Sequence, residues 1–400
     1  MEQNLTIGMA HHNDFSGAYF SIQDIRKELL FNRRYDLLHK IEFLIVENDH
    51  ESEHAKSLVN LQHHANNIRI VQLNDVQGTS ATRNKIIEEA KTNFVLVMDC
   101  HVLLCPVVDT LDRLFHFLEY NKNSKDLFTG PLIHDNFSTI STHYNDSWGA
   151  QMWGQWGTAW ECVCESYKFS IINDTSTCKF VSLEGQDRIE KCGYCDRKFP
   201  EKLGYSGHEK PLKGEGYERI GMNTLAEPFP IFAQGLGCFL THKNSWLKFN
   251  EHARGFGGEE CYIHEKYRQN GRKTYNLPFL RWLHRFGRPE GVKYELSIDN
   301  KVRNYVLEFT EIDLDMAPLK KHFVDENNFS LDKFNSLLSE AQSIYGKSNQ
   351  IVYNLPDEAI MKQIEMLQSR LSKTPTKRGG CCGNKKKQSH SASAQIGDSN

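Results

Sequence analysis

The sequence contains no run of about 20 apolar residues, the length that a transmembrane helix needs. Residues 1–4 carry no positive charge and lead into no long apolar stretch, so we expect no secretory signal peptide. The formal net charge of -3 over 400 residues is too small to attract nucleic acid broadly. These absences predict a cytoplasmic protein without stable membrane insertion, and nothing indicates a nucleic-acid partner.

Disulfide bonds are not expected either, although the sequence has 11 cysteines. The number is odd, two cysteines stand side by side in a polar tail, and no signal leads to an oxidising compartment. Reduced thiols or a metal site fit this pattern better. With 39% hydrophobic and 25% charged residues, the composition is that of a globular protein with one large domain or two.

The first third of the chain alternates between apolar runs and helical patterns. The runs at 41–46 and 94–98 are nearly uncharged, as in strands that are buried on both faces. Such alternation is typical of an α/β fold with a mostly parallel sheet flanked by helices. We expect strands at 5–9, 41–46, 68–73 and 94–98, and helices at 21–39, 53–64, 79–91 and 108–120.

Polar residues follow three of these strands, at the edge where α/β sheets bind their ligands. Residues 11–14 follow the first strand, Glu47 and Asn48 the second, and Asp99 and His101 the fourth. Asp99 and His101 are two positions apart and can point to the same side. A carboxylate with an imidazole suits a cation such as Mn²⁺. The alternative is two polar residues in a surface turn.

Several short motifs occur together in one order along the chain. They are Thr6–Ala10, Glu47-Asn48, Ala81–Asn84, Val97–His101, Gly257–Glu260 and Trp282–Phe286. By these motifs, which cover roughly 4–125 and 231–290, the chain resembles the family 2-like GT-A glycosyltransferases. The last two motifs and the Asp-x-His sequence look most like those of polypeptide N-acetylgalactosaminyltransferases. The resemblance implies a GT-A, Rossmann-like fold and a nucleotide-sugar donor bound with Mn²⁺ or Mg²⁺.

The resemblance also implies roles for single residues. Asp99, His101 and His284 would bind the metal. Glu47 would hydrogen-bond the nucleobase, expected to be uracil, and the N–H groups of Arg83 would meet carbonyl or phosphate oxygens. Taken alone, Glu47 could instead be a solvated strand end, Arg83 could form a surface ion pair, and His284 could be a core or surface histidine. The residues expected to bind the donor are Ala10, Glu47, Asn48, Arg83, Asp99, Gly257 and Gly258.

The segment Gly257–Glu260 is expected near the transferred sugar. Its two glycines would let the backbone approach sugar or acceptor closely, although a simple turn also explains them. Glu259 and Glu260 are the expected catalytic residues, and at a helix start they would also complement the helix dipole. Either could be the base of an inverting transferase. In a retaining one, the leaving phosphate would assist on the same face, and the sequence leaves both open.

The resemblance divides the chain into five parts. Residues 1–143 and 231–323 would be the nucleotide-sugar-binding and acceptor halves of the GT-A domain. Between them, 144–230 would be a Cys- and Trp-rich insertion, followed at the end of the chain by a helical appendage at 324–373 and a disordered tail at 374–400. The predicted activity moves a hexosyl or N-acetylhexosaminyl group from a UDP-sugar to an acceptor that the sequence does not identify.

Two other functions fit parts of the pattern. A nucleotidyltransferase has a similar sheet and a carboxylate-bound metal, but more often carries Lys or Arg after its first strand, and residues 11–17 contain neither. A non-catalytic, zinc-dependent binding module is the other. Cys192 and Cys195 have the spacing of a zinc half-site, and Cys162 with Cys164 could supply the other half. Free thiols are the alternative to a structural Zn²⁺.

Two further features have a simple explanation. The tryptophans at 148, 153, 156 and 160 stand just before the cysteine cluster, and a small aromatic core is expected there. Sugars and bases stack on such rings as well. The tail around Cys381 and Cys382 is basic, and we expect it to be solvated rather than to carry a lipid anchor.

Overall fold

The computed structural model describes most of the chain up to residue 347. All described residues fall within one compact unit. Among them, no helix is both long and apolar enough to cross a membrane. The described residues are 4–49, 51–63, 67–73, 78–104, 109–137, 139–162, 217–219, 227–288 and 291–347.

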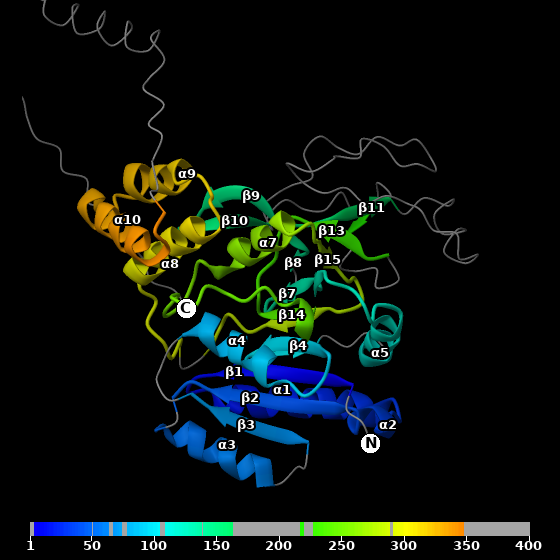
Figure 1. Ribbon diagram of the computed structural model, residues 1–400. Helices are drawn as coiled ribbons and strands as arrows, with labels where there is room; N and C mark the ends of the chain where they lie inside the picture. Colours follow the sequence, from blue (N-terminus) through cyan, green and yellow to red (C-terminus); the bar gives the residue numbers. More distant parts are fainter. Residues whose placement is uncertain are drawn as a thin grey trace, which may run out of the picture. The chain divides into compact units, whose positions relative to one another are not determined.

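A large sheet lies at the centre of the fold (Figure 1). Its strands are β1 (Leu5–His11), β2 (Ile41–Glu47), β3 (Ile68–Gln72), β4 (Phe94–Asp99), β6 (Leu127–Thr129), β13 (Phe229–Ile231), β14 (Cys238–His242) and β15 (Thr274–Asn276). Their spatial order is β13-β15-β6-β14-β4-β1-β2-β3. The pairs β4–β1, β1–β2, β2–β3 and β15–β6 are parallel, and the other three are antiparallel. The expected α/β fold with a mostly parallel sheet is confirmed.

Of the four helices expected in the first third of the chain, all are present, and only the first differs clearly in its bounds. The helix expected at 21–39 is wrong at both ends. It begins earlier because the Asp14 carboxylate caps it by accepting a hydrogen bond from the Gly17 N–H at 2.9 Å. It ends before Arg33, whose φ of 56° interrupts a helix, and a short helix follows. The helices are α1 (Phe15–Phe31), α2 (Tyr35–Leu38), α3 (Glu53–His63), α4 (Thr79–Glu89), α5 (Thr110–Tyr120), α7 (Glu259–Gln269), α8 (Ile298–Glu311), α9 (Ala317–Lys320) and α10 (Leu331–Tyr345), with the short η2 (Lys243–Ser245) and η3 (Lys321–Glu326).

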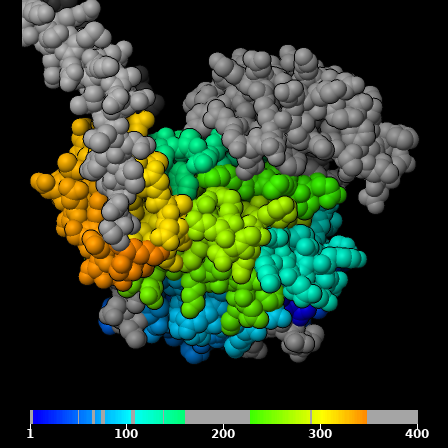
Figure 2. Space-filling view, turned by 45° about the horizontal axis from the view of Figure 1, so that its top comes forward, coloured from blue at the N-terminus to red at the C-terminus, as the bar shows by residue number. Residues whose placement is uncertain are grey.

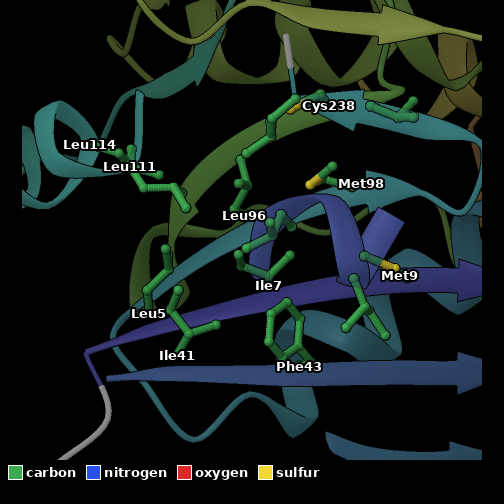
Figure 3. Close-up of a cluster of buried hydrophobic side chains, with 14 of the residues drawn as sticks. Leu5, Ile7, Met9, Ile41, Phe43, Leu96, Met98, Leu111, Leu114 and Cys238 are labelled. Atoms are coloured by element: carbon green, nitrogen blue, oxygen red, sulfur yellow. The ribbon is translucent and has the colours of Figure 1, made fainter. Parts of the chain in front are cut away.

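Alternate residues of the inner strands face opposite sides of the sheet. On β2, Phe43 belongs to the hydrophobic cluster of Figure 3, whereas Leu44 belongs to a second cluster on the other face. Helices α1 and α5 contribute to the first cluster, and α4 and α7 contribute to the second. Because both faces are covered, the inner strands are mostly apolar, and Glu42 of β2 is a buried exception that accepts hydrogen bonds from Thr6 and Arg69.

A second, smaller sheet brings a distant part of the chain to the end of β4. It consists of β5 (Val102–Leu104), β16 (Trp282–His284), β7 (Leu132–His134) and β8 (Ile140–Ser141), in that order. The antiparallel pair β16–β5 places His284 opposite Val102. Since Val102 directly follows the turn after β4, this register carries His284 to the residues 99–101.

The hairpin of β9 (His143–Gly149) and β10 (Met152–Gly157) packs beside α7. Strand β11 (Trp160–Cys162) pairs with β12 (Tyr217–Arg219). Helix α8 contacts both α7 and α10, and in Figure 2 the yellow surface of α8 lies between the orange of α10 and the yellow-green surface. Tyr305 of α8 and Phe334 of α10 share one cluster with the hairpin. The aromatic core expected of the tryptophans is confirmed for Trp148, Trp153 and Trp156.

Candidate functional site

A cavity of about 770 Å³ opens at the carboxyl ends of β1 and β4. Its walls come from the turn after β1, the start of α4, the loop before α7 and the segment after β16. Strand β1 lies between β2 and β4, so the strand order changes direction here: β2 and β3 follow on one side of β1, and β4 lies on the other. In α/β sheets, ligands bind at this kind of position, and the volume is that of a small-molecule site.

Asp99, His101 and His284 meet beside this cavity. One donor atom from each lies within 4.8 Å of the others. The two histidine Nε2 atoms are 3.0 Å apart, and His101 Nε2 lies 3.8 Å from Asp99 Oδ2. The predicted meeting of these residues is therefore confirmed, although 183 positions separate the histidines. The pairing of β16 with β5 is the reason.

The two imidazoles have the protonation state that a metal ligand needs. Burial lowers the pKa of His101, and burial together with the neighbouring His101 lowers the pKa of His284 to about 3. Both rings are thus neutral at neutral pH, which leaves each with a lone pair for a cation. Two imidazoles and one carboxylate form a donor set that suits a divalent transition metal such as Mn²⁺.

Arg83 on α4 connects this centre to the start of α7. Its guanidinium donates to Asp99 Oδ1 at 2.9 Å and to Glu259 Oε1 at 3.0 Å. Thr79 donates to the same Glu259 oxygen at 3.0 Å. Arg83 is only 3% exposed, so it forms a buried double ion pair and not a surface one. Such charge-assisted bonds are the stronger class of hydrogen bond.

The two oxygens of Asp99 have different neighbours. Oδ1 is taken by Arg83, whereas Oδ2 lies toward His101. Burial opposes the ionisation of Asp99, but the positive charge of Arg83 and its hydrogen bond, together with the nearby imidazoles of His101 and His284, outweigh burial, and the pKa of Asp99 falls below its usual value. Arg83 therefore keeps the carboxylate ionised and oriented, with one oxygen left for a cation.

Glu47 lies behind the cavity and not in it. Its side chain is fully buried, Oε2 contacts His11 Nδ1, and Oε1 accepts a hydrogen bond from the Asp49 N–H at 2.7 Å. His11 lines the cavity, and its Nε2 accepts from the Asp14 N–H at 3.2 Å. The register of β1 with β2 places Glu47 opposite His11, so the carboxylate contacts this histidine, and Glu47 is not among the residues that line the cavity.

The other residues expected at the donor divide into two groups. Ala10 and Asn48 line the cavity, as expected. Gly257 and Gly258 do not, because they face α8. A Cβ on Gly258 would lie only 3.0 Å from an oxygen of Glu308, so the glycine allows a close approach of α8 and not of a ligand.

Glu259, which is buried, and Glu260, which is half-buried, belong to an acidic cluster at the start of α7. Neither is among the residues that line the cavity. Burial and the charge of Glu259 raise the pKa of Glu260, and burial raises the pKa of Glu308 well above its usual value. Glu308 has no hydrogen-bond partner on either carboxylate oxygen within the described residues. Arg83 is thus the cation that supports this cluster from the side of the metal centre.

Two arginines at the site were not assigned from the sequence. Arg285 and Arg288 line the cavity directly after the metal-centre residue His284. After burial and Asp99, Arg288 has the largest effect on the pKa of His101, which places its charge close to the centre. Two arginines so soon after His284 could have indicated an anion-binding role in the sequence. Only the β16–β5 pairing shows that this segment lies at the cavity.

The zinc prediction falls outside the described residues. This holds for Cys164, Cys192 and Cys195, and the side chain of Cys162 is not among those described. The tail with Cys381 and Cys382 also lies outside. Among the described cysteines, residues 100, 238 and 261 are buried free thiols. Burial raises the pKa of all three, which makes them poor nucleophiles.

Comparison with known proteins gives a structural likeness without a sequence family. No family model matches the chain, and no curated protein matches it. Among solved structures, the chain is similar to the crystal structure of GalNAc-T7 with UDP, GalNAc and Mn²⁺, at 14% sequence identity and a TM-score of 0.46. The match covers 86% of this chain and 58% of that one, so the chain spans somewhat more than half of that protein's length.

Proposed function

We propose that the protein is a metal-dependent glycosyltransferase that uses a nucleotide-sugar donor, with UDP as the expected nucleotide. The convergence of Asp99, His101 and His284 beside a cavity at the ends of β1 and β4 carries this proposal. A divalent cation bound by them would neutralise the diphosphate as it leaves the sugar. The motifs that resemble GT-A transferases support the same activity. The donor sugar and the cytoplasmic location stay predictions.

The residues around the centre would hold the leaving group. Arg285 and Arg288 line the cavity and would place positive charge beside the phosphates, where negative charge develops as the glycosidic bond breaks. Arg83 would act indirectly, because its guanidinium is taken by Asp99 and Glu259. We therefore assign it a positioning role. Asn48 and Ala10, at the ends of their strands, would lie along the nucleoside.

The geometry does not support Glu259 or Glu260 as the base. Glu259 is held by Arg83 and Thr79, and neither glutamate lines the cavity. Among the described residues, the carboxylates that do line it are Asp14, Asp99 and Glu295. We propose that the start of α7 positions the centre through Arg83. Inversion and retention both stay open.

The test combines binding with product analysis. UDP and Mn²⁺ together should stabilise the native protein by about 2.7 kcal/mol at a ligand concentration of about 100 Kd, seen as a rise in Tm. In a panel of nucleotide sugars incubated with and without Mn²⁺, slow transfer to water should release UDP. Release of UMP and a sugar phosphate would instead show attack at phosphorus, as in a nucleotidyltransferase. No shift with UDP but a shift with another nucleotide would contradict the uridine assignment.

The variant Asp99→Asn tests the metal centre within this activity. The amide oxygen can still accept from Arg83, so the fold should persist, but the charge on Oδ2 is lost. We expect Mn²⁺-dependent turnover to fall by about 100-fold or more, since metal stabilisation of a leaving group is worth several kcal/mol. Asp36→Asn, at an exposed ion pair with Arg34, is the matched control. Full turnover by folded Asp99→Asn would show that the centre is structural.

A further inference from the structure

The cavity carries more positive than negative charge. Among the residues that the structure describes, five guanidinium or ammonium groups line it, against three carboxylates, and one of the five, Arg83, is already paired with Asp99 and Glu259. A divalent cation would balance the diphosphate of the donor, so the donor alone does not account for the excess. The cations are Arg83, Arg254, Arg285, Arg288 and Lys293, and the carboxylates are Asp14, Asp99 and Glu295.

The cations come from two different walls. Arg285 and Arg288 lie next to the metal centre, and their positive charges help to lower the pKa of His101. Arg254 comes from the loop before α7 and is held by α8. Its Nε donates to Asn300 Oδ1 at 2.9 Å, and its backbone N–H donates to Asn304 Oδ1 at 3.0 Å. Both partners are neutral amides, so they fix the position of Arg254 without cancelling its charge.

We propose that the second substrate, the sugar acceptor, carries an anionic group that Arg254 binds. This inference rests on the proposed function. The guanidinium of Arg254 is exposed, lines the cavity and is anchored by its Nε, which leaves its terminal N–H groups for a ligand. A planar pair of N–H donors matches a carboxylate, phosphate or sulfate. An acidic transferred sugar would present the same chemistry from the donor side.

Inorganic sulfate is the probe for this anion site. It is titrated by calorimetry into the protein saturated with UDP and Mn²⁺, with chloride adjusted to keep the ionic strength constant, because general screening would otherwise imitate binding. We expect one saturable sulfate site. Arg254→Gln should weaken sulfate at least about tenfold, the loss typical of a charge-assisted hydrogen bond, and more than it weakens UDP. Arg254→Lys, which keeps the charge, should retain part of the affinity.

Two nucleotide sugars distinguish the source of the anion. If the acceptor supplies it, sulfate binds equally well beside UDP-glucose and UDP-glucuronate. If the donor sugar supplies it, UDP-glucuronate binds more tightly than UDP-glucose, competes with sulfate, and loses its advantage in Arg254→Gln. That second result would overturn the assignment to the acceptor.

A control variant checks that the effect is specific to Arg254, and the possible negative results distinguish the anion site from the proposed function. Arg34→Gln changes the net charge equally at an exposed ion pair with Asp36, and it should leave sulfate binding unchanged. Absence of sulfate binding to the UDP–Mn²⁺ complex, or equal affinity in Arg254→Gln and wild type, would overturn the proposed site. If UDP itself fails to bind, the proposed function falls, and sulfate titrated with Mn²⁺ alone still decides whether Arg254 forms an anion site.

Discussion

Replacement of Arg83 by methionine should show how the metal centre and α7 depend on one cation. The guanidinium is 3% exposed and bonds Asp99 and Glu259, whose side chains are 19% and 1% exposed. Methionine fills similar space but leaves both carboxylates without a counter-charge. Loss of one partner from a buried ion pair costs about 3–5 kcal/mol. That is a large share of the free energy of unfolding of a typical domain, roughly 5–15 kcal/mol.

The loss in Arg83→Met should depend on pH in a defined direction. Without the guanidinium, burial raises the folded-state pKa of the Asp99 carboxyl above the unfolded value of about 4. A carboxyl whose pKa is raised by folding lowers the free energy of unfolding at pH values above its unfolded-state pKa. The loss of stability in the variant is therefore largest near neutral pH and shrinks toward about pH 4–5. Urea unfolding of wild type and variant at about pH 7.5 and pH 5 measures both deficits.

A second substitution separates this charge effect from lost packing. Glu259→Gln in the Arg83→Met background removes one of the two stranded charges and should recover part of the stability at neutral pH. A loss below about 1 kcal/mol at neutral pH, the range of surface pairs, would refute the reasoning. So would a deficit that does not change with pH or with Glu259→Gln.

Two further changes test the fold around the site. Burial raises the pKa of Glu28 to about 7, so ionisation of this carboxyl lowers the free energy of unfolding as pH rises from about 4.5 to 7. Glu28→Gln should therefore raise the free energy of unfolding by up to about 3 kcal/mol at pH 8 and leave it unchanged below pH 4. Thermal unfolding at both pH values checks this, and a gain that persists in acid would contradict it. Gly78 has a φ of 107°, and its Cβ would lie 2.3 Å from the Gly255 carbonyl oxygen, so Gly78→Ala should cost about 2–3 kcal/mol in urea unfolding. Gly271→Ala, whose Cβ meets nothing within 4 Å, should cost less, and equal losses would show that the contact is unimportant.

The sequence predicted those elements in which one hydrophobic period dominates. Strand β4 is apolar through Met98 and then changes to Asp99, so both the strand and the site at its end could be read from the chain. The limits of α7 can be read from the chain as well, because Gly257–Glu260 indicates a helix start and Asn270 with Gly271 is a strong stop signal. Helix α1 was placed wrongly because its start depends on the Asp14 cap and its end on the φ of Arg33, which no periodicity shows.

The contacts of the site depend on strand register, which the residue pattern does not contain. The meeting of His284 with His101 was expected only from a family resemblance, and the β16–β5 pairing now explains it. The register of β1 with β2 likewise turns Glu47 toward His11. The link from Arg83 to Glu259 spans 176 positions and requires α4 and α7 to lie on the same face of the sheet.

The most direct test of the central claim is pulsed EPR of Mn²⁺ bound to the protein with UDP. We expect nitrogen couplings from two imidazoles, those of His101 and His284, in the wild-type protein. In His284→Ala, one coupling should remain. Mn²⁺ bound with no imidazole coupling in the wild type, or with the same two couplings in His284→Ala, would contradict the proposed metal centre.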